Sequence, residues 1–179
     1  MKILSRCITK MLKPEPKKIF VDIMQSYDSN SVTGIQRVVR SIVDCLVTLH
    51  TDYEICLVYM TKTGYCITQN ILYDHYGTGS GEESPEIHFS GYDIFLGLDL
   101  NFRTLNHVHL NEMKLKGIKI YFFVYDILQL QDPHYFPDEC LFHFKRWSEI
   151  ISEYDGVVSS PEAVAHEYAE WRRSHYVGN

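Results

Sequence analysis

The sequence predicts an α/β domain of the Rossmann-like class, with a mostly parallel sheet and helices on both of its faces. Two observations lead to this prediction. Short apolar runs rich in β-branched and aromatic residues recur along the chain, and segments with apolar residues at helical spacing separate them. Strands that alternate with helices pair in parallel, and the helices then cover the sheet. With 179 residues, 45% of them apolar, the chain is large enough for one domain with a buried core.

The expected strands are apolar runs bounded by turn residues. The run over residues 18–24 has the composition of a strand buried on both faces, and 118–125 is the most strand-like run in the chain. Further strands are expected over residues 53–60, 65–68, 92–98 and 156–158.

The expected helices lie between these strands. Helices are predicted over residues 35–49, 107–116, 138–153 and 161–171, and loops over 70–91 and 126–137. Thr33 is a suitable N-cap for the first helix, and Gly117 is suited to end the second. Pro161 stands at the start of the last helix, where its missing N–H costs nothing.

Charge is unevenly distributed along the chain. With 17 Lys and Arg against 23 Asp and Glu, the net charge of −6 offers no broad basic face, so we expect no nucleic-acid partner. Residues 1–18 nevertheless carry +5, which leaves −11 on the rest. We predict that residues 1–17 are a basic amphipathic segment whose residues 2–13 contact an anionic membrane surface. The alternatives are a frayed terminus and a helix packed on another domain.

The cysteines indicate a reducing compartment. Five are present, without a C-x-x-C pattern, which favours free thiols over a disulfide framework. Cys45 and Cys56 fall in a helical and a strand pattern, where we expect buried thiols. No stretch resembles a secretory signal or reaches the roughly 20 apolar residues of a membrane span. We therefore predict a cytoplasmic location.

Several classes of site lack their signature. No D-x-D arrangement is present to hold a metal with a sugar diphosphate, and His107 and His109 would diverge on a helix. The phosphate-binding P-loop and the nucleophile elbow of hydrolases are also missing. The glycine pattern at residues 77–81 neither follows a strand nor opens a helix, so we interpret it as a loop. We expect no metal and no cofactor.

The loop after the first strand is a candidate anion site, because parallel sheets bind ligands at the carboxyl ends of their strands. It leads into a helix N-terminus, where unpaired N–H groups and the helix dipole favour negative charge. Thr33 stands at this N-terminus, Gly34 would let a ligand approach the backbone, and Arg37 could pair with phosphate or carboxylate. The alternative is an ordinary capped helix with a solvated arginine.

A second candidate is the long segment after the strand at 118–125. Asp126, preceded by Tyr125, is placed to accept a hydrogen bond from a sugar hydroxyl or to stabilise developing positive charge. Its alternative role is to cap the loop. Asp99 follows the strand at 92–98 and could face the same crevice.

Four segments, in this order, resemble bacterial glycosyltransferases of the GT4-like class with the GT-B fold, which build O-antigen and other surface polysaccharides. The resemblance covers residues 18–175, and many members of the class transfer mannose or rhamnose. The matching segments are Phe20-Val-Asp-Ile with Thr33-Gly-Ile-Gln-Arg-Val-Val, Tyr92-Asp-Ile-Phe-Leu-Gly-Leu-Asp, Phe123-Val-Tyr-Asp-Ile-Leu with Pro133 and Phe136-Pro137, and Asp155-Gly-Val-Val-Ser-Ser.

The resemblance implies a retaining, metal-independent transfer from a nucleotide sugar to a saccharide acceptor, which could be lipid-linked, at the inner face of the membrane. Residues 18–179 would be the Rossmann-like acceptor-side domain, the N-terminal half of a GT-B architecture. Gly34 and its neighbours would lie near the donor phosphates, Asp126 at the acceptor or the reacting sugar, and Asp99 near the cleft.

This sequence departs from the class pattern in two ways. Gln129 stands where the class usually has proline, and the chain ends at Asn179, before a donor-binding domain. We therefore expect this chain alone to be inactive as a transferase. The alternatives are a non-catalytic saccharide-binding or partner-docking domain and, on fold analogy alone, a small nucleotide-binding domain.

Overall fold

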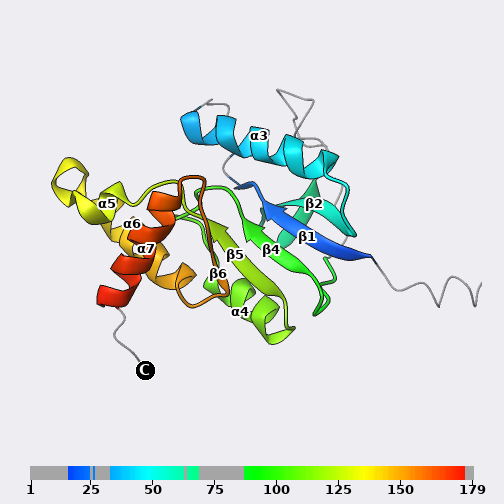
Figure 1. Ribbon diagram of the computed structural model, residues 1–179. Helices are drawn as coiled ribbons and strands as arrows, with labels where there is room; N and C mark the ends of the chain where they lie inside the picture. Colours follow the sequence, from blue (N-terminus) through cyan, green and yellow to red (C-terminus); the bar gives the residue numbers. More distant parts are fainter. Residues whose placement is uncertain (1–15, 25, 27–32, 63, 69–86, 176–179) are drawn as a thin grey trace, which may run out of the picture.

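The computed structural model describes residues 16–24, 26, 33–62, 64–68 and 87–175, and it forms one six-stranded sheet with helices on both faces (Figure 1). The strand order is β3-β2-β1-β4-β5-β6, and only the β2–β3 pair is antiparallel. The strands are β1 (Lys17–Asp22), β2 (Tyr53–Met60), β3 (Tyr65–Thr68), β4 (Ile94–Gly97), β5 (Lys119–Phe123) and β6 (Gly156–Val158). The predicted fold class is confirmed.

The helices follow the predicted order. They are α3 (Gly34–Thr48), α4 (His107–Leu115), α5 (Leu128–Gln131), α6 (Asp138–Ile151) and α7 (Glu162–His175), with a 3-10 helix η1 (Pro133–Tyr135). Gly117 ends α4 with a φ of 82°, the left-handed conformation expected of it. The last helix begins just after Pro161 and runs four residues past its predicted end.

The prediction of a loop over residues 126–137 is wrong in part. The segment contains α5 and η1, which are too short to produce a periodic apolar pattern in the sequence. The Asp126 carboxyl group accepts the N–H of Leu128 at 3.2 Å, and Pro133 begins η1. Most of the predicted loop over 70–91, and residues 1–15 of the basic segment, lie outside the described residues.

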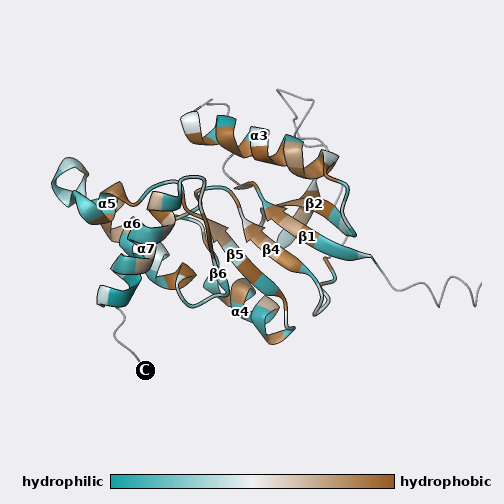
Figure 2. Ribbon diagram, viewed as in Figure 1, coloured by the Kyte–Doolittle hydropathy of each residue, from teal (hydrophilic) through white to brown (hydrophobic). Residues whose placement is uncertain are grey.

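One face of the sheet is covered by α3. Along β1, Val21 points to this face and Phe20 to the other, as the two-residue period of a strand requires. Val39 and Val43 of α3 pack there against Leu57 of β2, and all three side chains are buried. Figure 2 shows the apolar side of α3 turned toward the strands.

The opposite face carries α4, α6 and α7 and contains the larger core. Phe95 of β4 and Phe122 of β5 pack there with Trp147 of α6, and each is at most 1% exposed. Gly97 makes room for this packing, because a β carbon at that position would collide with the Phe122 ring. The sheet therefore has an apolar layer on each side, as the uninterrupted apolar runs predict.

The thiols are in part where the sequence places them. Cys56 on β2 is buried, but Cys45 is exposed on α3, so the expectation of a buried thiol there is wrong. Cys45 lies outside the apolar stripe of its helix, which Val39 and Val43 define. Cys66 and Cys140 are also free thiols. None of the described helices is long and apolar enough to cross a membrane.

Candidate functional site

The carboxyl ends of β1, β4 and β5 meet at one edge of the sheet, and we call it the carboxyl edge. β1 ends at Asp22, β4 at Gly97 and β5 at Phe123, and a segment with polar side chains follows each strand. The first turn of α3 and the short helix α5 lie at this same edge (Figure 1). Because ligands of parallel sheets bind outside the carboxyl ends of the strands, this edge is the candidate site.

Asp22 places a fully buried carboxyl group at this edge. Its Oδ1 accepts the N–H of Met24 at 3.0 Å, and its Oδ2 accepts the Nδ2 of Asn101 at 2.7 Å and the hydroxyl of Tyr65 at 3.4 Å. Burial raises the pKa of Asp22 to about 7, the hydrogen bonds oppose this change, and the charge of Asp99 adds to it. The group therefore changes charge near neutral pH without contact with solvent.

Asp99 ties the segment after β4 to the segment after β1. Its carboxylate accepts the backbone N–H groups of Ser26 and Leu100, and its own N–H donates to the carbonyl of Asp22 at 3.1 Å. Only 2% of Asp99 is exposed. The Asp99 carboxylate therefore holds the segments after β1 and β4 together. Because it is buried, it is not exposed at the surface of the carboxyl edge.

Tyr125 and Asp126 follow β5 and lie nearer to solvent. The Tyr125 hydroxyl donates to the carbonyl of Leu98 at 2.9 Å, which links the segments after β4 and β5. Burial raises the pKa of the Tyr125 phenol, and the charge of Asp99 adds to the increase. Asp126 is half-buried, and one of its carboxyl oxygens caps the turn into α5 through Leu128. Both proposed roles of Asp126, capping and ligand binding, remain compatible with this position.

The first turn of α3 has the capping predicted from the sequence. The Thr33 hydroxyl accepts the N–H of Gln36 at 3.3 Å, and the Gln36 side chain accepts the N–H of Thr33 at 2.8 Å. Gly34 is exposed, and among the described residues a β carbon there would meet nothing within 4 Å. Arg37 is also exposed. Neither packing nor a positive φ requires glycine at position 34.

The structure thus brings some of the predicted residues together. Asp99 and Tyr125 belong to one network of hydrogen bonds, and Asp126 adjoins it through the backbone. Thr33 and Arg37 lie at the same edge, on α3, and the described contacts do not join their side chains to that network.

Sequence reasoning missed three residues of this network: Asp22, Tyr65 and Asn101. The position of an acid inside the apolar run 18–24 was a usable signal for Asp22, because a buried strand rarely carries an acid that has no partner. Asn101 stands two residues after Asp99, which is a weaker signal. Tyr65 comes from the antiparallel strand β3, and nothing in its neighbourhood in the sequence indicated its contact with Asp22.

Metal-ligating side chains do not gather within the described part of the chain, where no group of three or more His, Cys, Asp or Glu is placed to hold an ion. His107 and His109 contact different partners, Glu153 and Glu112, each at 3.4 Å. The chemical resources of the carboxyl edge are therefore hydrogen-bonding groups: carboxylates, phenols, amides and the first turn of α3.

Comparison with known proteins finds three similar curated proteins, each described as the serotype-specific mannosyltransferase WbdA of Escherichia coli. Two are 28% identical over 165 residues, which is 89% of this chain, and the third is 30% identical over 173 residues, or 92% of it. This chain is similar to one stretch of each of these mannosyltransferases. It spans about a fifth of the length of these relatives, between 19% and 21%. No family model and no solved structure matches the chain.

This relationship confirms, at a general level, the resemblance to glycosyltransferases seen in the sequence motifs. The aligned stretch covers about nine-tenths of the chain, so it includes most or all of the carboxyl edge. The identity is too low to transfer the role of any single residue.

Proposed function

We propose that this chain is the acceptor-side domain of a glycosyltransferase that adds a sugar from a nucleotide sugar to a growing surface polysaccharide or lipid-linked saccharide. The observation that carries the proposal is the position of Asp126. This half-exposed carboxylate lies at the carboxyl edge of a Rossmann-like sheet, in a chain similar to mannosyltransferases over most of its length.

In this proposal the residues divide into two groups. Asp126 accepts a hydrogen bond from an acceptor hydroxyl, or stabilises positive charge that develops on the reacting sugar. Thr33, Gly34 and Arg37 face the donor phosphates, because the exposed first turn of α3 offers N–H groups and a guanidinium. Asp99 and Tyr125 fix the loops between which the saccharide binds, since their polar groups hold backbone atoms.

The donor-binding part belongs, in this proposal, to residues outside this chain, because the relatives are about five times longer. Residues 18–179 then form the N-terminal half of a GT-B enzyme of the GT4-like class. Transfer retains the anomeric configuration and uses no metal, as the resemblance in the motifs implies. The chain alone would bind acceptor and would not transfer sugar.

The proposed location is the inner face of the cytoplasmic membrane. The basic amphipathic pattern of residues 2–13 supports contact with anionic lipid, and a lipid-linked acceptor would be anchored in the same bilayer.

The second candidate function is a non-catalytic module that binds saccharide or docks on a partner. Tyr135 and Phe142 favour it, because they expose 76% and 62% of their surface on the unit formed by η1 and α6. The enzyme and a saccharide-binding module both bind saccharide, and they differ in whether transfer appears once a donor-binding half is supplied.

Titration of the chain with neutral mannose oligosaccharides, followed by NMR, tests the proposal. We expect the amide signals at the carboxyl edge to shift, and Asp126→Asn to weaken binding by about tenfold, because a hydrogen bond to a charged group contributes about 1.5–3 kcal/mol. Asp132→Asn is the matched control, since Asp132 is an exposed acid in the same segment. Binding that is equally strong in Asp126→Asn would remove Asp126 from the site.

Transfer is then measured with a donor-binding half of a relative added in trans. Sugar transfer that depends on Asp126 supports the enzyme. Binding without any transfer favours the non-catalytic module.

A further inference from the structure

The edge opposite the carboxyl edge is built from the starts of β1, β4 and β5, and we call it the amino edge. The N–H of Lys18 donates to Oδ1 of Asp93 at 2.9 Å, and the N–H of Lys119 donates to the carbonyl of Asp93 at 3.3 Å. The three strand starts are therefore bonded to one another. Lys17 and Lys18, which directly follow the basic segment of the sequence, lie at this edge beside the turn that carries Tyr92.

Two apolar side chains stand out from this edge into solvent. Leu115, at the end of α4, is 88% exposed, and Tyr92, before β4, is 76% exposed. The turns that carry them touch, because a β carbon on Gly91 would lie only 3.0 Å from the carbonyl oxygen of Lys116. A leucine and a tyrosine so exposed on one corner bury little surface within the described fold, so this corner has the character of a contact surface.

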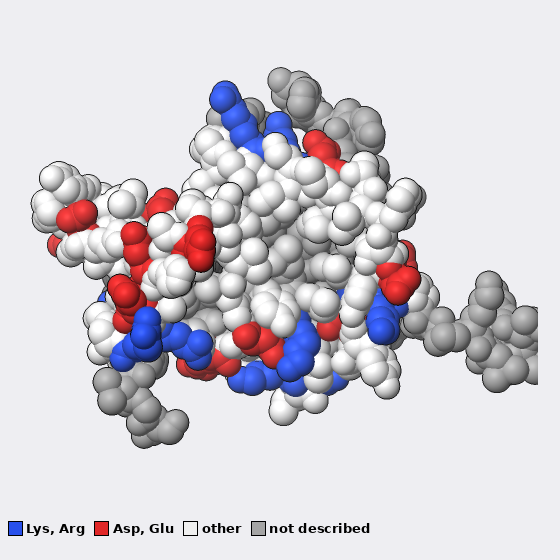
Figure 3. Space-filling model, in the orientation of Figure 1, with Lys and Arg blue, Asp and Glu red and all other residues white. Residues whose placement is uncertain are grey.

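Lysines surround this apolar corner. The Lys116 ammonium lies 5.8 Å from the centre of the Phe89 ring and the Lys17 ammonium 5.7 Å from that of Tyr53. Neither lysine belongs to a salt bridge among the described residues, whereas Lys119 pairs with Asp155 at 2.7 Å. Figure 3 shows Lys and Arg along the lower margin of the molecule, from the lower end of α7 to the region under α4 and the starts of β4 and β5, with acids between them.

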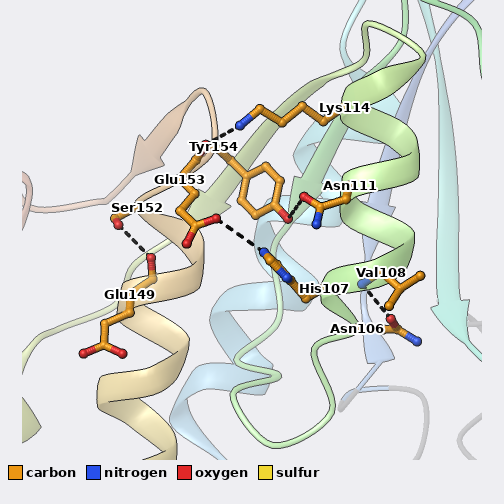
Figure 4. A network of polar contacts seen from close by, with 9 residues as sticks. All are labelled: Asn106, His107, Val108, Asn111, Lys114, Glu149, Ser152, Glu153 and Tyr154. Carbon is orange, nitrogen blue, oxygen red and sulfur yellow. Dashed lines mark hydrogen bonds and ion pairs between the residues drawn. The ribbon is translucent and has the colours of Figure 1, made fainter. Parts of the chain in front are cut away.

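The corner is also held in place, because α4 is bonded to the segment that follows α6 (Figure 4). Lys114 donates to the carbonyl of Glu153 at 2.8 Å, the Tyr154 hydroxyl donates to Asn111 at 3.2 Å, and His107 lies 3.4 Å from Glu153. A side chain on a rigid support loses little conformational freedom when it is buried, which favours its use in binding.

We propose that the amino edge is a second membrane-binding surface: Leu115 and Tyr92 enter the headgroup region of an anionic bilayer while Lys17 and Lys116 face the lipid phosphates. Exposed leucine and tyrosine flanked by lysine match the apolar boundary and the negative charge of such a bilayer. The basic amphipathic pattern of residues 2–13 predicts a first contact with the membrane. A second contact is needed because stable attachment to a bilayer takes two membrane-binding elements.

The membrane-binding surface is inferred independently of the proposed function. Only the purpose assigned to it, which is to orient the domain, rests on that function. The ends of parallel strands lie at opposite edges of a sheet, so membrane contact at the amino edge turns the carboxyl edge and Asp126 away from the bilayer. The site would then face the free end of a growing saccharide, at a distance from its lipid anchor.

Vesicle co-sedimentation of the full chain tests the surface, with phosphatidylcholine vesicles and with vesicles that also contain phosphatidylglycerol. We expect binding to the anionic vesicles that falls with salt and is weakened about tenfold in Leu115→Ser, because the variant loses most of one buried leucine side chain. Lys116→Glu should weaken binding and reduce its salt dependence. Phe142→Ser and Lys62→Glu are matched controls, exposed side chains away from this edge, and should bind as the wild type does.

Fluorescence provides a readout that misfolding would not imitate. Tyr92→Trp should show a blue shift of its emission with anionic vesicles, whereas Tyr135→Trp, at an equally exposed position, should not. The same shift in both variants, or wild-type binding by Leu115→Ser, would overturn the proposal. So would a change in self-association, without a change in vesicle binding, in the Leu115 variant. None of these readouts involves sugar, so failure of this surface and failure of the transferase function are distinguished.

Discussion

Burial of the Asp22 carboxyl group couples its protonation to folding. The group lies among Tyr65, Asn101 and the charge of Asp99, and its pKa is raised from 3.8 to about 7. The Oδ1 atom of Asn101 is buried and accepts no hydrogen bond within the described residues. A half-turn of that amide would let Oδ1 accept the proton of a neutral Asp22, so the cluster can satisfy either charge state.

The stability of the domain should depend on pH through Asp22. Between about pH 4 and about pH 7 the folded protein holds the Asp22 proton and the unfolded chain releases it, so this group makes the free energy of unfolding fall as pH rises. Asp22→Asn removes that dependence. Relative to the wild type, the variant should therefore gain stability with rising pH, by at most about 1.4 kcal/mol per pH unit in this window.

Urea unfolding at pH 5, 6, 7 and 8 measures this difference. Asp132→Asn, an exposed acid, serves as the control and should follow the wild-type curve. Parallel curves for Asp22→Asn and the wild type would mean that Asp22 ionises as it does in the unfolded chain.

At the scale of elements, α3 is the helix whose start the sequence defines best. Thr33 and Gln36 form a reciprocal capping box, and the Gln36 side chain is buried beneath it. The cap satisfies N–H groups that would otherwise lack partners in the first turn, and it fixes the turn at the carboxyl edge.

Thr33→Ala should lower the free energy of unfolding by about 1 kcal/mol, because the variant loses the cap acceptor for the N–H of Gln36. Thr33→Ser keeps the hydroxyl and should lose much less. Urea denaturation monitored by circular dichroism measures both. Equal losses in the two variants would show that the methyl group of Thr33, rather than its hydroxyl, supports the helix.

The sequence predicted the strands and the long helices because their apolar periodicity is local. The segment 126–137 resisted prediction, since α5 is capped by the Asp126 carboxyl group, which accepts the N–H of Leu128, and since α5 packs against α6 and η1. Asp99 and Asp126 were selected as candidate site residues because each directly follows an apolar run, and their roles stay predictions. The contacts of Asp22 with Tyr65 and Asn101 span 43 and 79 residues, and only the paired strands bring those residues together.

At the scale of the whole molecule, the sheet separates two surfaces of different chemistry. The carboxyl edge presents the partly buried Tyr125 and Asp126 and the first turn of α3, whereas the amino edge presents lysines with Leu115 and Tyr92. The central strands β1 and β4 connect these two edges, and β3 and β6 are outermost.

Hydrogen exchange measured by NMR tests whether the centre of the sheet is the stable unit. Amides of β1 and β4 should exchange slowest. Each of these strands is paired with a neighbour on both sides, and an apolar core covers each face of the sheet there. Amides of β3 should exchange faster, since this four-residue antiparallel strand pairs, among the described strands, with β2 alone. Exchange at equal rates in β3 and β1 would mean that the sheet opens only as a whole, and Tyr65 would then hold Asp22 until global unfolding. Faster exchange in β3 would mean instead that the Tyr65–Asp22 contact breaks first, which would free one side of the carboxyl edge while the rest of the domain stays folded.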